Sequence, residues 1–404
     1  MHVPLRELCT FKHGGTPSKA NPSYWQGDIP WVSPKDMKCH LIDDATDHIS
    51  DLAIQNSAAS TVARGSILVV VRSGILAHSF PIAQAGRPVA FNQDIKAVMP
   101  KPAAVDADYI YWFLRSCERK VVAQGVKKGA TVHSVQSGFI EKLDVPLPTR
   151  EEQRRLVDLL SRAEGIVRLR REAQQKAAEL VPAIFIDMFG DPNKNPKRLR
   201  TLPLKDLVAE FRYGTSQKSG PIGSPVLRIP NVVSGALNLD EIKLVALKDH
   251  EYTRLLLRDG DLLFVRTNGN PDYVGRCAVY EESALRAAGF DGDDCVYASY
   301  LIRARVVAER ASPTYLQAYL SGAHGRRLLR ERAKTSAGQF NVNIDGLGSI
   351  PVLLPDAAFQ TTFKLHVEAA ESIIAQQDAA KAKAVASFEA LLAQAFTHRI
   401  EEAA

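Results

Sequence analysis

Long apolar runs, a secretion signal and paired cysteines are what this sequence lacks. No stretch of 18 apolar residues occurs, so we expect no membrane-spanning segment. Met1–Glu7 is not a basic region followed by an apolar core, so we expect no secretory signal. The five cysteines are odd in number, and no two of them have C-x-x-C spacing. This argues against a disulfide framework and a zinc knuckle, and it favours a reducing cytoplasm.

The motifs of common catalytic sites are also missing. There is no G-x-x-x-x-G-K-[ST] phosphate loop and no H-E-x-x-H metal motif. Asn21–Tyr24 superficially resembles the Asn/Asp-Pro-Pro-aromatic motif of amino-methyltransferases, but its third residue is serine and no Gly-rich loop precedes it. Glu241–Lys243 lacks the preceding Pro-Asp that a nuclease metal site requires. We therefore interpret these segments as a turn and a charged strand edge, and expect no catalytic residue and no metal ligand.

Length and charge set broad limits on the protein. A chain of 404 residues is too long for one ordinary core and indicates two or three domains. The apolar content of 46% and the charged content of 24% are normal for a globular protein. The net charge of +6 is compatible with binding nucleic acid, although it is not specific to that function.

An internal repeat organises the chain. Short segments recur in the same order about 200 residues apart, which indicates two diverged copies of one unit. In this alignment Arg72 and Arg266 are equivalent, each following a β-type run and preceding a glycine-containing turn. The clearest matches are Pro4–Leu8 with Pro203–Leu207, Gly65–Arg72 with Gly260–Arg266, and Val145–Pro148 (then Gln153) with Val352–Pro355 (then Gln360).

Each copy is predicted to have a strand-rich part followed by a long helix. Short β-type runs are broken by Gly, Pro, Asn and Asp, and a stripe of apolar residues at 3–4 spacing follows them. Thr149 and Glu152 form a capping-box signal, and Pro182 predicts a local kink or fraying. The predicted segments are a first globular domain 1–148, a helix 149–190, a linker 191–202, a second globular domain 203–355 and a helix 356–398.

Neither helix can cover its apolar stripe alone. We therefore expect an α+β fold in which two repeated globular domains are separated by two long helices packed as an antiparallel coiled coil. The positions assigned to this helix pairing or to a partner are Leu156, Leu160, Ile166, Leu180, Phe363, Val367, Ile374, Phe388 and Leu392.

Several of these segments resemble one known family. Gly14–Ser18 and Tyr24–Val32 resemble the opening of a target-recognition domain of a type I restriction–modification specificity subunit. Gly129–Ser134 resembles the segment before its exit, Val145–Pro148 followed by Glu151–Gln153 resembles the exit into the spacer helix, and Phe185–Pro192 resembles the junction between the halves. The resemblance follows the family's order along the whole chain. The second half departs from it, because the Gly-Thr-Pro-Ser opening and the Tyr-Trp pair are absent there.

The resemblance implies a non-catalytic scaffold that reads double-stranded DNA in the cytoplasm of a bacterium or archaeon. Each recognition domain would read one half of a split, asymmetric site, and the chain would hold two adenine-N6 methyltransferase subunits, with or without a restriction/translocase subunit, in phage defence. S-adenosylmethionine is expected on the methyltransferase partner and not on this chain. The alternatives are the specificity subunit of a fused methyltransferase–nuclease system, a free-standing DNA-modifying enzyme, and an interaction protein without a DNA role.

DNA contacts are expected from polar and basic loop residues, because Arg, Lys, Asn, Gln, Ser and Thr read base edges and grip phosphates. Each such residue has the alternative interpretation of a solvated or structural loop residue, and Trp25 and Trp31 favour a core position. Candidates in the first domain are Thr16, Ser18, Lys19, Tyr24, Arg72, Ser73, Asn92, Gln93, Lys127, Lys128, Thr131 and His133. Candidates in the second are Arg212, Lys218, Arg228, Asn231, Arg266, Thr267, Asn268, Asn270, Gln339, Asn341 and Asn343.

Overall fold

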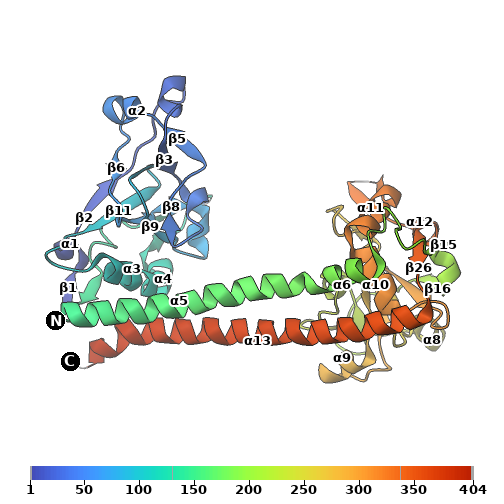
Figure 1. Ribbon diagram of the computed structural model, residues 1–404. Coiled ribbons are helices and arrows are strands. Elements are labelled where there is room, and N and C mark those ends of the chain that lie inside the picture. The colour runs from blue at the N-terminus through green and yellow to red at the C-terminus, as the bar shows by residue number, and fades with distance from the viewer. Residues whose placement is uncertain (1, 130, 337, 402–404) are drawn as a thin grey trace. The chain divides into compact units, whose positions relative to one another are not determined.

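A computed structural model describes residues 2–129, 131–336 and 338–401 (Figure 1). Ala130, in the segment that resembles the one before the exit of the recognition domain, lies outside the described residues. The chain divides into two compact units. The first unit comprises the chain up to residue 171 together with residues from 379 onward, and the second unit comprises residues 172–378. The long helices are shared between the units, so the units do not follow the five segments of the sequence, whose boundaries stay a prediction.

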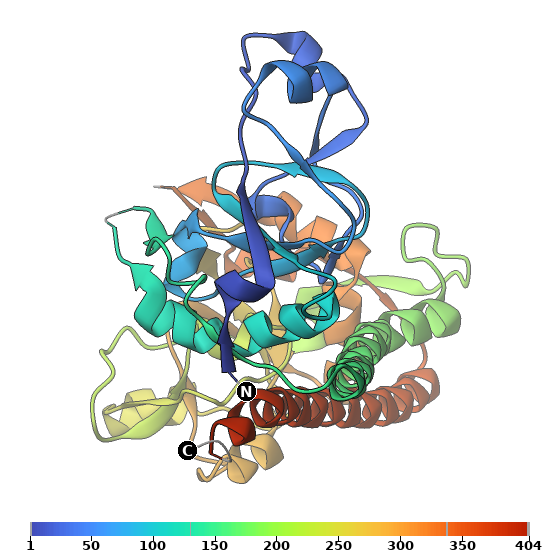
Figure 2. The same ribbon diagram turned by 90° about the vertical axis from the view of Figure 1, so that its left-hand side faces the viewer.

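The first unit is built from a large mixed sheet and smaller sheets around one core. The middle strands of the large sheet are fully buried, because the sheet packs against helix α3, whose apolar face includes Ile110 and Trp112. Strand β1 (His2–Pro4) lies close to the C-terminal part of helix α13 (Ala357–Glu401) in both views (Figures 1 and 2). The sheet orders are β2(Cys9–His13)-β11(Ile95–Pro100)-β7(Ile67–Val70)-β9(Ile82–Ala85)-β4(Leu41–Ile42), β5(Asp47–Ile49)-β3(Ile29–Val32)-β10(Val89–Phe91)-β6(Thr61–Val62), β12(Val126–Lys127)-β13(His133–Val135)-β8(Arg72–Ser73) and β1(His2–Pro4)-β14(Asp144–Pro146). The short helices are α1(Leu5–Leu8), α2(Asp51–Asn56), α3(Ala107–Ser116) and α4(Glu118–Lys120).

The second unit repeats this plan with shorter sheets. Its sheet orders are β16(Val208–Tyr213)-β23(Leu301–Val306)-β19(Leu262–Val265)-β21(Cys277–Val279), β18(Lys243–Val245)-β17(Ser224–Leu227)-β22(Val296–Tyr297), β20(Thr267–Asn268)-β25(Gln339–Asn341)-β24(Lys334–Ser336) and β15(Arg200–Pro203)-β26(Pro351–Leu354). Its short helices are α7(Ile229–Val232), α8(Asp249–Leu255), α9(Glu282–Ala287), α10(Pro313–Ser321), α11(Ala323–Arg332) and α12(Ile344–Gly348).

The two topologies correspond strand by strand. The order β2-β11-β7-β9 matches β16-β23-β19-β21, and the parallel pair β3–β10 matches the parallel pair β17–β22. The antiparallel pair β1–β14 likewise matches β15–β26. The repeat predicted from the sequence is therefore confirmed as a structural repeat.

The first long helix breaks where proline predicts a break. Helix α5 spans Arg150–Ala178 and helix α6 spans Leu180–Phe189, with Glu179 between them. Pro182 has no N–H to donate to the carbonyl of Ala178, so the regular i to i−4 ladder is interrupted at that point. The second long helix, α13, runs without a break from Ala357 to Glu401.

Each unit buries part of α13. In the first unit, Leu160 and Val167 of α5 share a core cluster with Phe388 and Phe396 of α13. In the second unit, α6 and α13 meet through aromatic side chains, and the ring centroids of Phe185 and Phe363 are 5.7 Å apart.

The mixed content of helices and sheets confirms the predicted α+β class. No helix among the described residues is long and apolar enough to cross a membrane.

Candidate nucleic-acid interface

A small three-stranded sheet gathers several predicted contact residues of the first unit. Arg72 pairs with Ser134, and Ser134 pairs with Lys127 on its other side. Directly paired residues point to the same face of a sheet, so these three side chains form one row. Ser73 pairs with His133 in the adjacent row, which points to the opposite face.

The loop that connects β12 to β13 adds exposed polar groups. Lys128 and Thr131 are exposed, and the backbone N–H of Gly129 donates to Nδ1 of His133 at 3.2 Å. The backbone oxygen of Thr131 lies 3.6 Å from where a Cβ would stand on Gly74, so the loop approaches the turn after Ser73. Arg72 and Lys127 thus lie in one row of the sheet, and exposed Lys128 follows in the adjoining loop.

The turn between β10 and β11 lies beside the row. The carboxylate of Asp94 in this turn forms an ion pair with Arg72, at 3.0 Å from its Nε. Gln93 is exposed and pairs with Thr16, whose Oγ1 lies 2.5 Å from its Oε1. Asn92 corrects the prediction: it is only 6% exposed, and its side-chain amide bonds to both the backbone and the carboxylate of Asp94. It therefore shapes the turn and has no free edge for a ligand.

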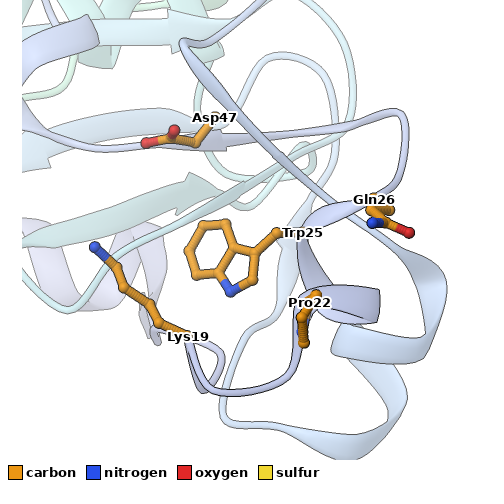
Figure 3. A pocket seen from close by; sticks show the side chains of 5 residues that line it. All are labelled: Lys19, Pro22, Trp25, Gln26 and Asp47. Carbon is orange, nitrogen blue, oxygen red and sulfur yellow. The ribbon is translucent and has the colours of Figure 1, made fainter.

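Ser18, Lys19 and Tyr24 form a second group in the first unit. They lie around the 3₁₀ turn Pro22–Trp25, where Trp25 donates from Nε1 to the carbonyl of Ser18 at 3.2 Å. Trp25 lies at the centre of a hollow of about 460 Å³ lined also by Lys19, Pro22, Gln26 and Asp47 (Figure 3). Trp31 is 6% exposed and meets Trp25 edge to face, so the preference for a core position is confirmed for Trp31, whereas Trp25 is half-buried.

The corresponding small sheet of the second unit carries a matching row. Thr267 pairs with Asn341, and Asn341 pairs with Lys334. Gln339 precedes Asn341 on β25, and its Oε1 accepts from Oγ1 of Thr267 at 2.9 Å. Lys334 is exposed and was missed by the sequence reasoning. The sequence repeat could have identified it, because residues 127–135 align with 334–342 without a gap, and this alignment matches Lys127 with Lys334.

The remaining polar residues of this surface bond mainly within their own turns. Asn268 accepts from the backbone N–H of Asn270, and Asn270 accepts from the N–H of Asp272, each at 2.9 Å. Asn343 caps helix α12 by accepting from the N–H of Gly346 at 2.8 Å. Asn270 and Asn343 stay exposed beside the sheet and Asn268 is half-buried, so their other polar atoms remain on this side of the unit.

The predicted equivalence of Arg72 and Arg266 is wrong by one residue. The N–H groups of Val71 and Arg266 each donate, at 2.8 Å, to the equivalent carbonyls of Asp94 and Tyr300. The backbone therefore matches Arg266 to Val71, and Arg72 to Thr267. Because side chains alternate along a strand, this shift turns Arg266 to the other face.

The guanidinium of Arg266 stacks on an aromatic ring and forms no ion pair with the residues that the structure describes. Its guanidinium carbon lies 4.6 Å from the ring centroid of Tyr213, and Nη1 donates to the carbonyl of Ser299 at 3.3 Å. Stacking of this kind leaves the positive charge uncompensated. Tyr300, at the position of Asp94, is 57% exposed.

The second unit retains a trace of the opening motif that the sequence comparison had not found. A Cβ on Gly14 would stand 2.2 Å from the Asn92 carbonyl oxygen, and one on Gly214 would stand 2.2 Å from that of Tyr297. The segment Gly214-Thr215-Ser216 thus follows β16 as Gly14-Gly15-Thr16 follows β2. Both glycines permit a backbone approach that any side chain would block.

Arg228 and Asn231 belong to one loop, and Asn231 also corrects the prediction. Asn231 is 2% exposed, accepts from the backbone N–H of Arg228 at 2.8 Å and donates to the carbonyls of Asn238 and Glu241. Its amide is fully used inside the loop. Arg228 is half-buried with Glu241 at 3.4 Å. Lys218 is exposed in the loop after β16.

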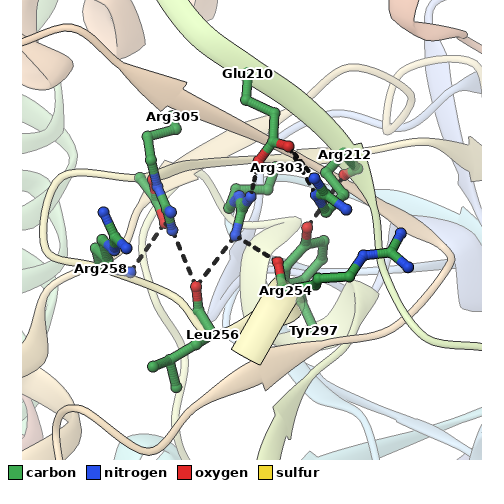
Figure 4. Close-up of polar contacts among 9 residues, drawn as sticks. Glu210, Arg212, Arg254, Leu256, Arg258, Tyr297, Arg303 and Arg305 are labelled. Carbon is green, nitrogen blue, oxygen red and sulfur yellow. Dashed lines mark hydrogen bonds and ion pairs between the residues drawn. The ribbon is translucent and has the colours of Figure 1, made fainter. Parts of the chain in front are cut away.

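Arg212 joins a charged network inside the second unit (Figure 4). Its Nε donates to Glu210 at 2.9 Å, and Glu210 also pairs with Arg303, which is 1% exposed. The hydrogen bond from Arg212, aided by the charge of Arg303, holds the pKa of the Glu210 carboxyl below its usual value. Arg303 further donates to the carbonyls of Arg254 and Leu256. Arg212 is thereby tied to the sheet, which favours the structural interpretation for it.

Most helix positions assigned from the sequence are buried or half-buried. Ile166 is the exception, since it is 53% exposed while its neighbour Val167 is 5% exposed. The spacing Leu156, Leu160, Ala163, Val167 keeps a regular 4-3-4 stripe, and Ile166 departs from it. The buried positions are Leu160 and Phe388 in the first unit and Phe363 and Val367 in the second, and the half-buried ones are Leu156, Leu180, Ile374 and Leu392.

The described residues offer little for catalysis. No group of three or more His, Cys, Asp or Glu among them is placed to hold a metal ion. Burial raises the pKa of the Cys9, Cys277 and Cys295 thiols to about 12, so these thiols stay protonated near neutral pH. What the surface does offer is hydrogen-bond donors, acceptors and positive charge on two equivalent sheets.

Comparison with known proteins finds a family match for the first part of the chain. Residues 1–179 match the family model described as the type I restriction modification DNA specificity domain. The specificity subunit of the type I restriction enzymes EcoR124I/EcoR124II of Escherichia coli is 34% identical over 177 residues, which cover 44% of this chain and 44% of that protein. The EcoKI specificity subunit of Escherichia coli strain K12 is 26% identical over 306 residues, covering 71% of this chain and 64% of the relative. The chain thus spans less than two thirds of the length of these curated relatives.

Solved structures share the fold. The S subunit of a type I restriction–modification system from M. genitalium is 13% identical, with a TM-score of 0.56 over 98% of this chain and 96% of that one. A chain from a structural study of complex assembly and conformational transition of the type I R-M system is 15% identical, with a TM-score of 0.62 over 98% of this chain and 97% of that one. Residues 1–179 are thus similar to the type I restriction modification DNA specificity domain, and the chain shares the fold of these solved S subunits along nearly its whole length.

Proposed function

We propose that this chain is a non-catalytic subunit that reads a bipartite, asymmetric DNA site and positions two adenine-N6 methyltransferase subunits on it. One observation carries the proposal: the same three-stranded sheet occurs in both units, with Arg72, Ser134 and Lys127 in one row and Thr267, Asn341 and Lys334 in the other. Two equivalent surfaces with different side chains suit two half-sites of different sequence. Lys127 and Lys334 occupy the same place in both rows and suit the phosphate contacts that any sequence provides.

The long helices are proposed to act as the spacer between the two readers, packed as an antiparallel coiled coil. Support comes from the apolar stripes of α5, α6 and α13, which are buried within each unit. Readers on one face of B-DNA must stand about one helical turn, roughly 34–36 Å, apart. At a rise of about 1.5 Å per residue, helices as long as α5 and α13 can span this distance.

The partners follow from this role. The methyltransferase subunits would carry S-adenosylmethionine and the transfer chemistry, and a restriction/translocase subunit would add cleavage to the same recognised site. We place the complex in the cytoplasm, where host DNA is its substrate.

Mapping N6-methyladenine across the host genome tests the proposal. The chain is co-expressed with the methyltransferase encoded beside it, and each protein is also expressed alone. A split, asymmetric methylated motif should appear only with both proteins, and exchange of residues 1–148 should change one half-site only. Methylation of the same motif by the partner alone, or a motif in one contiguous piece, would overturn the proposal.

A further inference from the structure

Two contacts with Asp94 fix the direction of the Arg72 side chain, and this arrangement is called the Arg72 device below. Its backbone N–H donates to the carbonyl of Asp94 at 3.2 Å, and its Nε lies 3.0 Å from the Oδ1 of the same residue. The arginine side chain is nevertheless 60% exposed. Asp94 thus contacts both the backbone N–H and the Nε of Arg72, while the side chain as a whole stays largely exposed to solvent.

Asp94 is itself rigidly placed. Asn92, which is 6% exposed, donates from Nδ2 to Oδ2 of Asp94 at 3.1 Å and accepts from its backbone N–H at 3.1 Å. The remaining oxygen, Oδ1, is buried and accepts no hydrogen bond from the described residues, so its ion pair with Arg72 is what compensates its charge. A buried carboxylate oxygen without another partner strongly favours keeping the arginine in place.

The two terminal nitrogens of Arg72 have no hydrogen-bond or ion-pair partner among residues 2–129, 131–336 and 338–401. A guanidinium whose Nε is anchored presents these nitrogens side by side in one plane. Two parallel donors match the O6 and N7 acceptors on the major-groove edge of guanine. Since the orientation is set before binding, less side-chain entropy is lost when the base is met.

The two terminal nitrogens of an arginine could instead donate to the oxygens of a DNA phosphate. The adjacent carboxylate, however, cancels most of the long-range attraction of Arg72 for a polyanion, while it leaves the donor geometry intact. Lys127 lies in the same row, is exposed and makes no ion pair with the described residues, so the phosphate role falls to it.

We infer that Arg72 reads a guanine in the half-site recognised by the first unit, with Asp94 as its positioning residue. This inference rests on the proposed function and adds a base to it. The second unit lacks the device, because Thr267 stands at the place of Arg72 and Tyr300 at the place of Asp94. The contact is therefore specific to one half-site.

The experiment uses the complex of this chain with its methyltransferase. The half-site of the first unit is the one that changes when residues 1–148 are exchanged. Methylation rates are then compared for duplexes that carry guanine, 7-deazaguanine or inosine at each guanine of this half-site. 7-deazaguanine lacks N7, whereas inosine keeps O6 and N7 and serves as the matched control. The protein variants are Arg72→Ala, Arg72→Lys and Asp94→Asn, with Arg64→Ala, at an exposed position in the turn before strand β7, as the control.

At one guanine, we expect 7-deazaguanine to slow the wild-type complex by roughly 5-fold or more, equivalent to about 1 kcal/mol, because it removes one of the two acceptors of the bidentate contact, while inosine has little effect. Arg72→Ala and Arg72→Lys should accept other bases at that position, and Asp94→Asn should do so partly. The salt dependence of binding should keep its slope, because no phosphate contact is lost.

Three results would overturn the inference: a first half-site without guanine, equal rates on 7-deazaguanine and guanine at every position, or an Arg72→Ala complex that weakens on all sequences equally with a slope reduced by about one. The deazaguanine result is obtained with the wild-type chain, so it holds even if a variant does not fold. A wild-type complex that methylates no split site contradicts the proposed function instead.

Discussion

A buried glutamine fastens each long helix to the domain before it. In the first unit, Gln153 is 1% exposed, accepts from the backbone N–H of Asp106 and donates to the carbonyl of Pro148, both at 3.0 Å. In the second unit, Gln360 is 4% exposed and makes the equivalent bonds, to the N–H of Ser312 at 2.7 Å and the carbonyl of Pro355 at 2.8 Å. Asp106 and Ser312 are the N-caps of α3 and α10, so one side chain joins the starts of two helices.

We predict that Gln153→Ala strongly destabilises the first unit. The change leaves one backbone N–H and one carbonyl in a water-poor site without partners. Each such group costs about 1–3 kcal/mol, so we expect a loss of roughly 2–6 kcal/mol in the free energy of unfolding. Gln153→Glu keeps the acceptor for Asp106 but turns a second oxygen toward the Pro148 carbonyl, so it should not rescue stability. Gln360→Ala should have a similar effect on the second unit.

The assay is urea unfolding of the purified chain. The three tryptophans, Trp25, Trp31 and Trp112, all lie in the first unit, so their fluorescence reports its unfolding, while circular dichroism follows both units. Gln55→Ala, on an exposed position of α2 in the first unit, is the control and should stay within about 0.5 kcal/mol of wild type. A tryptophan-monitored stability of Gln153→Ala within the same limit would refute the reasoning.

Three further predictions concern a charge, a core position and the two matching lysines. Burial alone would raise the pKa of Glu164, but the hydrogen bond from His40 at 2.8 Å and the charge of Arg115 lower it overall. The ionised form therefore stabilises the fold above the ordinary glutamate pKa of about 4.3, and this contribution is lost as the pH falls through the lower folded value. Urea unfolding should find Glu164→Gln destabilised by about 2 kcal/mol at neutral pH, with a difference from wild type that shrinks as the pH falls below about 4.3, and a pH-independent difference would contradict this. Thermal or urea unfolding should show that Val167→Ala costs about 2 kcal/mol, whereas Ile166→Ala stays within about 0.5 kcal/mol; the reverse order would restore the stripe predicted from the sequence. Titration of the methyltransferase complex with DNA should show that Lys127→Ala and Lys334→Ala each weaken binding on all sequences and reduce the salt slope by about one, and unchanged slopes would remove both lysines from the phosphate contacts.

The large-scale organisation was readable from the sequence because it depends on patterns that repeat. Proline at position 182 predicted the break between α5 and α6, since a missing N–H acts locally whatever surrounds it. The match of Gln153 with Gln360 marked two equivalent helix starts. Apolar spacing at 3–4 residues likewise indicated the long helices, and short β-type runs indicated the sheets.

Side-chain roles at the candidate interface were less predictable, because they depend on register and on contacts between distant segments. A one-residue shift in the repeat alignment placed Arg72 and Arg266 together, although the backbone turns them to opposite faces. The composition of a loop also does not reveal that the side-chain amides of Asn92 and Asn231 form hydrogen bonds within their own loops and are therefore not available to a ligand. Lys334 shows the opposite case, since an ungapped alignment of the two small sheets would have found it.

The strand-by-strand correspondence allows the Arg72 device to be rebuilt in the second unit. Asn92 and Ala298 are equivalent, because each donates its N–H at 2.9 Å to the neighbouring parallel strand, at Val32 and Leu227 respectively. The second unit therefore differs from the first at three places: the reader, the carboxylate that anchors it and the amide that holds the carboxylate.

We predict that Thr267→Arg alone adds little sequence preference, because no acid fixes the new side chain and nearby Arg266 repels it. Adding Tyr300→Asp supplies the carboxylate, and adding Ala298→Asn holds it in place. Only the triple variant should prefer guanine at one position of the second half-site, by about 5-fold or more in methylation rate, since a full bidentate contact is worth about 1–3 kcal/mol. If Thr267→Arg alone gives the same preference, the direction of the arginine does not depend on its anchor, and Asp94 has no positioning role in the first unit either.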